Sequence, residues 1–248
     1  PEAMALHPLN YALGIARAAD EAGVRIFENS RVRDYSGTDP AVVRTDRGSV
    51  KASHIVLGCN GYLGNLEPRT AGKIMPINNF MIATESLGEE RALELIKGRF
   101  GVHDTRFVVN YFRLSQDFRL LFGGGENYRP GFPRDIAKFV RPCMLKVFPQ
   151  LSDVKIDYAW GGTLSVTVSR LPHVGRLEPN VWYAQGYSGH GIPTANFAGK
   201  IVAEAIAGVA GRFDAFASLP SQTFPGGTML RYPGMVLAML YYGLRDRL

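Results

Sequence analysis

The part of the sequence that most limits the fold is a strand-like run, a glycine-rich segment and a helical pattern in direct succession. Val181–Gln185 is strand-like, Gly186-Tyr-Ser-Gly-His-Gly191 follows it, and a helical pattern runs from about Pro193 to Ala207. Three glycines in six residues let a ligand approach the backbone, and the helix directs its unpaired N–H groups and positive dipole end to the same place. The pattern predicts either a binding turn for an anionic group or a tight turn with nothing bound.

The first 65 residues predict an α/β unit. A helix is expected at about 8–22, because apolar residues recur at helical spacing and Gly23 ends the pattern. Val24–Phe27 is predicted to be a short strand, and three further short strands are expected at 31–35, 42–45 and 50–53. His54–Gly58 is nearly all apolar, which is typical of a central strand that is buried on both faces. It leads into Cys59-Asn60-Gly61-Tyr62, at the carboxyl end of a strand, where open α/β sheets bind ligands.

The middle of the chain has a different pattern. Longer β-type runs with polar interruptions are expected at 75–84, 106–114 and 118–122, and helices at 89–97 and 134–148. These runs predict a separate antiparallel sheet with flanking helices. The expected fold class is therefore α/β (α+β). It comprises an α/β domain from residues 1–65 and 156–211, an inserted antiparallel-sheet domain at 66–155, and a C-terminal tail at 212–248.

Charge and cysteine content exclude several functions. The formal net charge is +6 and the charges are scattered without a block of like charges, so we expect no nucleic-acid partner. The 2 cysteines form no disulfide scaffold, and a cytoplasmic location is expected. No apolar run is long enough to cross a membrane, and no signal peptide is recognisable. The apolar segment 235–244 predicts a docked C-terminal helix, with an interfacial membrane helix as the alternative.

Searches for catalytic motifs give one partial match. Gly186-Tyr-Ser-Gly-His190 is similar to the Gly-x-Ser-x-Gly turn of serine hydrolases, with Ser188 as nucleophile. The match fails at one place, because His190 stands where the second glycine is needed. The five histidines and two cysteines have no metal-ligand spacing, so no metal is expected. The sequence also contains no Gly-x-Gly-x-x-Gly and no phosphate-binding loop of the Gly-x-x-x-x-Gly-Lys-Ser/Thr type.

Several segments carry a resemblance when they are taken together. They are Leu6-His-Pro-Leu9, Val43-Arg-Thr-Asp-Arg-Gly48, His54-Ile-Val-Leu-Gly58, Arg119-Leu-Leu-Phe-Gly-Gly124, Leu171-Pro-His-Val-Gly175 and Tyr183-Ala-Gln-Gly-Tyr-Ser-Gly-His-Gly191. The combination resembles the D-amino-acid-oxidase superfamily of FAD-dependent amine oxidoreductases, which includes glycine and sarcosine oxidases. Within it, Trp160-Gly-Gly162, Arg170-Leu-Pro172 and Thr223-Phe-Pro-Gly-Gly227 look most like the gamma-glutamylputrescine oxidases.

The resemblance implies a set of cofactor-binding residues. Val32 would meet the adenine of FAD through its backbone. Four residues would line the adenosine side: Gly58, Cys59, Asn60 and Gly61. Seven would face the isoalloxazine and ribityl chain: Gly186, Tyr187, Ser188, Gly189, His190, Gly191 and Ile192. The FAD is expected to be non-covalent, since no cysteine lies near Trp160.

The resemblance also implies a reaction and a substrate side. Hydride would pass from an amine carbon to the flavin, giving an aldehyde, ammonia and, with oxygen as acceptor, hydrogen peroxide. Ser188, His190 and Trp160 are the expected catalytic residues, and Trp160, Gly161 and Arg170 the expected substrate contacts. Relatives that act on α-amino acids place an arginine near this Trp-Gly-Gly segment. Its replacement by glycine favours an amine without an adjacent carboxylate.

Members of this superfamily begin with a strand–Gly-x-Gly-x-x-Gly–helix that holds the FAD pyrophosphate. That motif is missing here, so the chain is expected to be the C-terminal part of a longer protein and to bind FAD weakly or not at all by itself. Three other functions stay open. They are oxidation of glycine, sarcosine or a D-amino acid by the same fold, hydrolysis through Ser188, and a non-catalytic interaction module.

Overall fold

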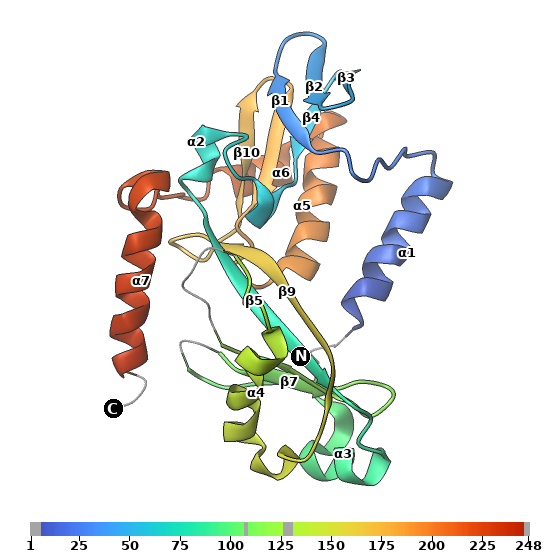
Figure 1. Cartoon of the computed structure of the whole chain (residues 1–248). Coiled ribbons are helices and arrows are strands. Elements are labelled where there is room, and N and C mark those ends of the chain that lie inside the picture. The colour runs from blue at the N-terminus through green and yellow to red at the C-terminus, as the bar shows by residue number, and fades with distance from the viewer. Residues whose placement is uncertain (1–5, 107–108, 126–130, 246–248) are drawn as a thin grey trace. The chain divides into compact units, whose positions relative to one another are not determined.

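A computed structural model of the chain describes residues 6–106, 109–125 and 131–245, and they divide into two compact units. Unit 1 comprises residues 1–76 and 164–231, and unit 2 comprises residues 77–163 and 232–248 (Figure 1). The strands β5 (Met75–Thr84) and β9 (Ile156–Val166) connect the two units. The expected α/β (α+β) class is confirmed, because both units combine helices with sheets and two of the three sheets are wholly antiparallel in the pairings that the structure describes.

Unit 1 contains a small antiparallel sheet. Its strands are β1 (Val32–Ser36), β2 (Ala41–Thr45) and β3 (Gly48–Ala52), which pair in sequence order. All three were predicted from short β-type runs, and each begins or ends within two residues of the prediction. Ala41 and the side chains of Tyr35 and Val43 pack this sheet against the second sheet of the unit.

The second sheet of unit 1 has the order β10–β11–β4, formed by His173–Glu178, Val181–Gln185 and Ile55–Leu57. β11 is antiparallel to β10 and parallel to β4, with Tyr183 opposite Leu57. Helices α5 (Gly191–Ile206) and α6 (Gly211–Ala217) cover one face of this sheet (Figure 1). The helix expected at about 193–207 is confirmed as α5, and its buried residues Ala198, Ile201, Val202 and Ala205 recur at spacings of three and four residues.

Two expectations for the N-terminal part are wrong. Val24–Phe27 forms no strand, and its side chains at Val24, Ile26 and Phe27 are exposed, because no neighbouring strand pairs with it in the described part of the chain. β4 is also not buried on both faces. Ile55 and Leu57 lie in the core, but Val56 is 49% exposed. Val56 lies opposite Trp182, on the side of the sheet that α5 and α6 cover. The two helices pack on Trp182 but do not extend over Val56.

The remaining helices of unit 1 contribute little to its core. α1 (Pro8–Glu21) confirms the expected helix at 8–22 and buries none of its residues. η1 (Asn60–Tyr62) is a single turn after β4, and α2 (Pro68–Ala71) precedes β5. α7 (Gly227–Arg245) begins in unit 1 and is longer than the apolar segment that predicted it. The Arg231 guanidinium, at the start of α7, donates hydrogen bonds to the carbonyl oxygens of Ala71 and Ile74.

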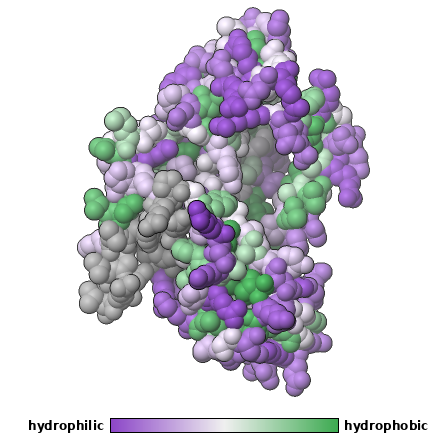
Figure 2. Space-filling model, in the orientation of Figure 1, coloured by the Kyte–Doolittle hydropathy of each residue, from purple (hydrophilic) through white to green (hydrophobic). Residues whose placement is uncertain are grey.

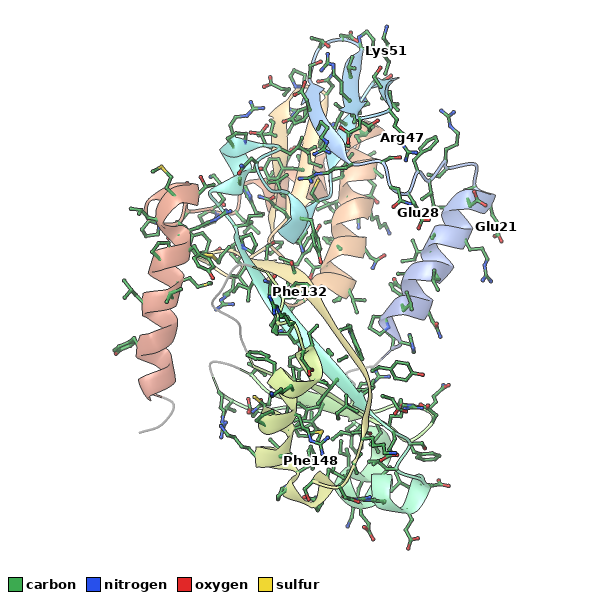
Figure 3. All side chains as sticks on the ribbon, in the orientation of Figure 1. Glu21, Glu28, Arg47, Lys51, Phe132 and Phe148 are labelled. Carbon is green, nitrogen blue, oxygen red and sulfur yellow. The ribbon has the colours of Figure 1, made fainter. Side chains whose placement is uncertain are left out.

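Unit 2 is built on a five-stranded sheet of order β6–β7–β8–β5–β9. Its shorter strands are β6 (Val102–His103), β7 (Tyr111–Leu114) and β8 (Leu120–Gly123), and its helices are α3 (Glu89–Leu95), η2 (Lys97–Arg99), α4 (Ile136–Val147) and η3 (Pro149–Leu151). The predicted antiparallel sheet with flanking helices is confirmed. Val140 and Met144 of α4 pack on the sheet together with Phe148, which Figure 3 labels at the end of that helix.

One face of the molecule is mostly hydrophilic. Hydrophilic residues cover most of the face in Figure 2, and hydrophobic residues occur there in small scattered groups. Within the described ranges, no helix is both long and apolar enough to cross a bilayer.

Candidate functional site

The turn between β11 and α5 has a backbone that only a few residue types can adopt. Gly186, Ser188 and Gly189 have positive φ angles of 72°, 51° and 92°. A Cβ on Gly186 would lie 2.5 Å from Cγ2 of Thr167, so glycine is required there by packing as well as by backbone angle. A Cβ on Gly189 would meet nothing within 4 Å. Gly186 therefore serves the fold, whereas Gly189 leaves open space beside the turn for a ligand.

The first turn of α5 presents free donors beside that open space. The N–H of Thr194 donates to the carbonyl of the cap residue His190 at 3.3 Å, and Pro193 has no N–H. The N–H groups of Gly191 and Ile192 have no acceptor within the helix, and the His190 side chain does not cap them. Two donors and the positive end of a 16-residue helix dipole thus remain available to an anionic group.

Ser188 uses its polar atoms to hold the turn. Its N–H donates to the carbonyl of Ser165 at 2.9 Å. Its Oγ donates to the carbonyl of Gly186 at 3.2 Å and accepts from the N–H of Thr167 at 3.3 Å. Among the described residues no histidine is hydrogen-bonded to this hydroxyl, and His190 is exposed. The arrangement lacks the base that a serine nucleophile needs, which argues against hydrolysis through Ser188.

The loop after β4 meets this turn. Because β4 and β11 are parallel, their carboxyl ends lie at the same edge of the sheet. Oδ1 of Asn60 accepts from the N–H of Gly186 at 2.9 Å and from Oγ of Ser165 at 2.5 Å. Two of the three segments that the resemblance assigned to FAD, residues 58–61 and 186–192, are therefore brought together.

The other members of the 58–61 loop have different surroundings. A Cβ on Gly58 would meet nothing within 4 Å, so the backbone is open to close approach there. Gly61 is buried. Burial raises the pKa of the Cys59 thiol, which is free and half-buried. Val32, the third assigned position, begins β1 opposite Thr45 and makes no described hydrogen bond to either loop.

The predicted substrate residues are divided between the two units. Trp160 and Gly161 belong to unit 2, on β9, and Trp160 is 44% exposed. A Cβ on Gly161 would lie 2.8 Å from the Phe80 ring and 3.1 Å from that of Phe132 (Figure 3). No larger side chain fits at this position, so glycine there is a packing requirement.

Arg170 belongs to unit 1 and lies in the loop between β9 and β10. It is exposed and has a positive φ of 63°. Its N–H donates to the carbonyl of Thr167 at 3.3 Å. In the described ranges, its guanidinium is paired with no carboxylate, so its charge is available to a ligand.

A buried histidine network lies directly before the turn. His173 is 5% exposed. Nε2 of Gln185 donates to His173 Nδ1 at 3.1 Å and to the carbonyl of Thr70 at 3.0 Å. His173 therefore carries its ring proton on Nε2, which donates to the Tyr183 hydroxyl at 2.9 Å. Burial, with the charge of Lys73, lowers the pKa of His173 to about 4, so the imidazole is neutral at pH 7.

A second polar cluster, which the sequence did not point to, lines an open cavity with Tyr35, Gly37, Thr38 and Leu66. Its centre is Glu67, a carboxylate that is 4% exposed and caps α2 by accepting from the N–H of Arg69 at 2.7 Å. The Arg69 guanidinium donates to Glu67 at 3.0 Å and to Glu178 at 2.7 Å, and the Tyr35 hydroxyl also donates to Glu67. Every charged group in it is paired, so the cluster ties β1, α2 and β10 together.

The described residues hold no group of three or more histidine, cysteine, aspartate or glutamate side chains that fits a metal ion. The turn itself fits the isoalloxazine end of a flavin, because that end carries an electron-rich edge and the turn offers backbone donors beside open space. No described helix offers a Gly-x-Gly-x-x-Gly turn for the pyrophosphate.

Comparisons with known proteins show which family the chain belongs to. The chain is 47% identical to gamma-glutamylputrescine oxidoreductase of Escherichia coli (strain K12) over 98% of its length and 57% of that protein. It is 42% identical to the "Probable oxidoreductase OrdL" of Rhizobium meliloti (strain 1021), over 98% of this chain and 56% of the relative. The chain thus spans less than two thirds of the length of these relatives.

The structure is similar to that of glycine oxidase from Geobacillus kaustophilus. The TM-score is 0.66 at 18% identity, over 79% of this chain and 53% of the other, which supports the fold alone. Residues 1–205 match the family described as "DAO: FAD dependent oxidoreductase". The chain therefore belongs to the DAO family of FAD-dependent oxidoreductases.

Proposed function

We propose that this chain carries the flavin-facing turn and the substrate unit of an FAD-dependent oxidoreductase that oxidises a gamma-glutamylputrescine-like amine. The observation that carries the proposal is the turn at 186–191, which offers two free N–H groups at the start of α5 and is fixed by Asn60. The relative with 47% identity, named for gamma-glutamylputrescine, suggests the substrate.

The residues have distinct roles in this proposal. Gly191 and Ile192 would direct their N–H groups at the electron-rich edge of the isoalloxazine, and the α5 dipole would favour negative charge there. Gly189 leaves room for the ring system, and the open backbone at Gly58 leaves room on the adenosine side. When bound, FAD supplies a two-electron acceptor: the amine carbon gives up a hydride, the imine is hydrolysed to an aldehyde and ammonia, and oxygen is reduced to hydrogen peroxide.

The packing around Gly161 supports an amine without an adjacent carboxylate. A bidentate carboxylate clamp needs a guanidinium. The Phe80 and Phe132 rings leave no room for any side chain at position 161, so a clamp cannot be built there without repacking unit 2. Arg170 is the alternative clamp, and an amino acid is the corresponding alternative substrate.

The test is the visible spectrum of the holoenzyme, in the full length that its gene encodes. Anaerobic gamma-glutamylputrescine is expected to bleach the flavin bands, while glycine and sarcosine at the same concentration leave them oxidised. If only glycine or sarcosine bleaches the flavin, the flavoenzyme assignment stands and the proposed substrate is wrong. Absence of flavin would contradict the proposal and favour a non-catalytic interaction module.

Ser188→Ala separates oxidase from hydrolase. The substitution removes two hydrogen bonds of the Ser188 hydroxyl to backbone groups, each worth about 1 kcal/mol, so amine oxidation is expected to fall by less than about 30-fold. A hydrolase would lose its nucleophile and all activity. Ester hydrolysis by the wild type that disappears in Ser188→Ala, without amine oxidation in either protein, would reverse the assignment.

Residues 1–248 alone are expected to bind FAD at least about 100-fold more weakly than the E. coli relative does, or ~2.7 kcal/mol, because they contain no Gly-x-Gly-x-x-Gly turn for the pyrophosphate. Quenching of flavin fluorescence on titration with each protein measures both dissociation constants. Equal affinities would show that this chain holds the cofactor without such a turn.

A further inference from the structure

Asn60 is the residue that joins the two loops at the carboxyl edge of the sheet. It stands 126 positions from Gly186 and 105 from Ser165, and its Oδ1 accepts a hydrogen bond from each, at 2.9 Å and 2.5 Å. The Gly186 N–H is also 3.2 Å from Ser165 Oγ. All three residues lie in unit 1, and Ser165 and Gly186 are buried.

The Gly186 N–H needs side-chain acceptors because no regular element supplies one, and Asn60 Oδ1 is the nearer of the two. Gly186 follows the last residue of β11, and four residues separate it from the first residue of α5, so neither sheet pairing nor helix bonding reaches its N–H. An unpaired N–H in a buried position is costly. Ser165 adds a second link, since its carbonyl accepts from the N–H of Ser188 at 2.9 Å. The turn is thus fixed at Gly186 and Ser188, immediately before the free donors of α5.

We propose that Asn60 is a positioning residue for the flavin-facing turn: it holds the Gly186 N–H so that the first turn of α5 keeps its direction toward the cofactor. This assigns Asn60 a role at the isoalloxazine end, in place of the adenosine contact expected from the resemblance. The inference rests on the proposed function, because it assumes that the turn faces FAD.

Asn60 has two requirements that separate variants can isolate. Its φ of 47° is in the left-handed region, which Gly, Asn and Asp tolerate. Its Oδ1 acts only as an acceptor here. Asn60→Asp keeps both properties, whereas Asn60→Gly keeps the backbone angle and loses the acceptor. Asn29→Gly is the matched control, because Asn29 has a φ of 52°, is exposed and makes no side-chain hydrogen bond among the described residues.

The experiment compares these variants as full-length holoenzymes. In Asn60→Gly we expect the rate of anaerobic flavin reduction by the amine to fall about 10- to 100-fold, which corresponds to the loss of one or two buried hydrogen bonds. We also expect the flavin midpoint potential to become more negative, because misdirected donors stabilise less of the added charge. kcat should fall with KM for the amine nearly unchanged. Asn60→Asp should be clearly less impaired than Asn60→Gly, because it keeps the acceptor, and the control Asn29→Gly should remain within about threefold of the wild type.

Three results overturn the inference. The first is an Asn60→Gly protein with lower thermal stability but wild-type potential and reduction rate, which would show a purely structural role. The second is an Asn60→Asp protein that is as impaired as Asn60→Gly. If Asn60→Gly does not fold, the experiment uses Ser165→Ala instead. The third contradicting result is then a wild-type flavin midpoint potential in Ser165→Ala. A wild-type holoenzyme that lacks flavin or is not reduced by any amine contradicts the proposed function itself.

Discussion

Gly186→Ala is expected to destabilise unit 1 by about 2–5 kcal/mol. Placing an alanine at a φ of 72° costs about 1–2 kcal/mol. The added Cβ would also lie 2.5 Å from Cγ2 of Thr167 and 3.3 Å from Cγ2 of Ile74, an overpacking worth about 1–3 kcal/mol. Urea unfolding measures the change. In a Trp160→Phe background the remaining tryptophan, Trp182, lies in the core of unit 1, so its fluorescence reports that unit alone.

Gly189→Ala is the matched control for this prediction. Its φ of 92° imposes the same kind of backbone strain, but its Cβ would point into open space. It should therefore cost only the backbone share, about 1–2 kcal/mol, and its methyl group should weaken FAD binding in the holoenzyme. Equal urea midpoints for the two variants would contradict the packing role of Gly186.

The strand–turn–helix unit could be predicted from sequence because its features are local. Glycine at positive φ, an apolar strand before it and one apolar helix face after it are all visible within 27 residues, from Val181 to Ala207. The role of Asn60 could not be predicted in the same way. Its hydrogen bonds reach across 126 and 105 positions, and only the parallel pairing of β4 with β11 brings them together.

The role of a glycine cannot be predicted from its local sequence alone, because it depends on tertiary packing. The resemblance predicts Gly161, next to Trp160, as a substrate contact, and in the structure the Phe80 and Phe132 rings occupy the place where a side chain of residue 161 would lie. A Cβ on Gly189, in contrast, would point into open space. A glycine in a sequence indicates only that a side chain is absent, and the tertiary fold decides whether a ligand or a neighbouring ring takes the space.

Two wrong predictions, the strand at Val24–Phe27 and the burial of Val56 in β4, share one physical cause. Both segments have strand propensity and apolar side chains, and both were predicted as strands on that basis. A strand is stabilised by hydrogen bonds to a partner and by side chains on its faces. The described residues supply no partner for Val24–Phe27 and no cover for Val56, so local propensity overstated their order and burial.

Glu67→Gln is expected to destabilise unit 1 by about 1–3 kcal/mol at pH 7, because donors of Tyr35 and Arg69 then face an amide, while the half-exposed Arg69 guanidinium keeps its ion pair with Glu178. Glu67 is 4% exposed and accepts from Tyr35 and from three N–H groups of Arg69. Glu178→Gln is the control. That carboxylate also pairs with Arg69, but its side chain is 43% exposed, so solvent screening limits the expected loss to less than about 1 kcal/mol.

The pH dependence gives the same prediction a second readout. Burial opposes ionisation of Glu67, but hydrogen bonds from Arg69 and Tyr35 outweigh it and lower its pKa in the folded state. A carboxyl group whose folded pKa lies below its unfolded value of about 4.3 contributes stability above that value and loses it as the pH falls through the folded pKa. The stability difference between wild type and Glu67→Gln should therefore be constant from pH 7 to about 5 and shrink below about 4. Urea midpoints at each pH, read from Trp182 fluorescence, measure it. A difference that persists unchanged to pH 3 would mean that the charge of Glu67 is not what holds β1 to α2.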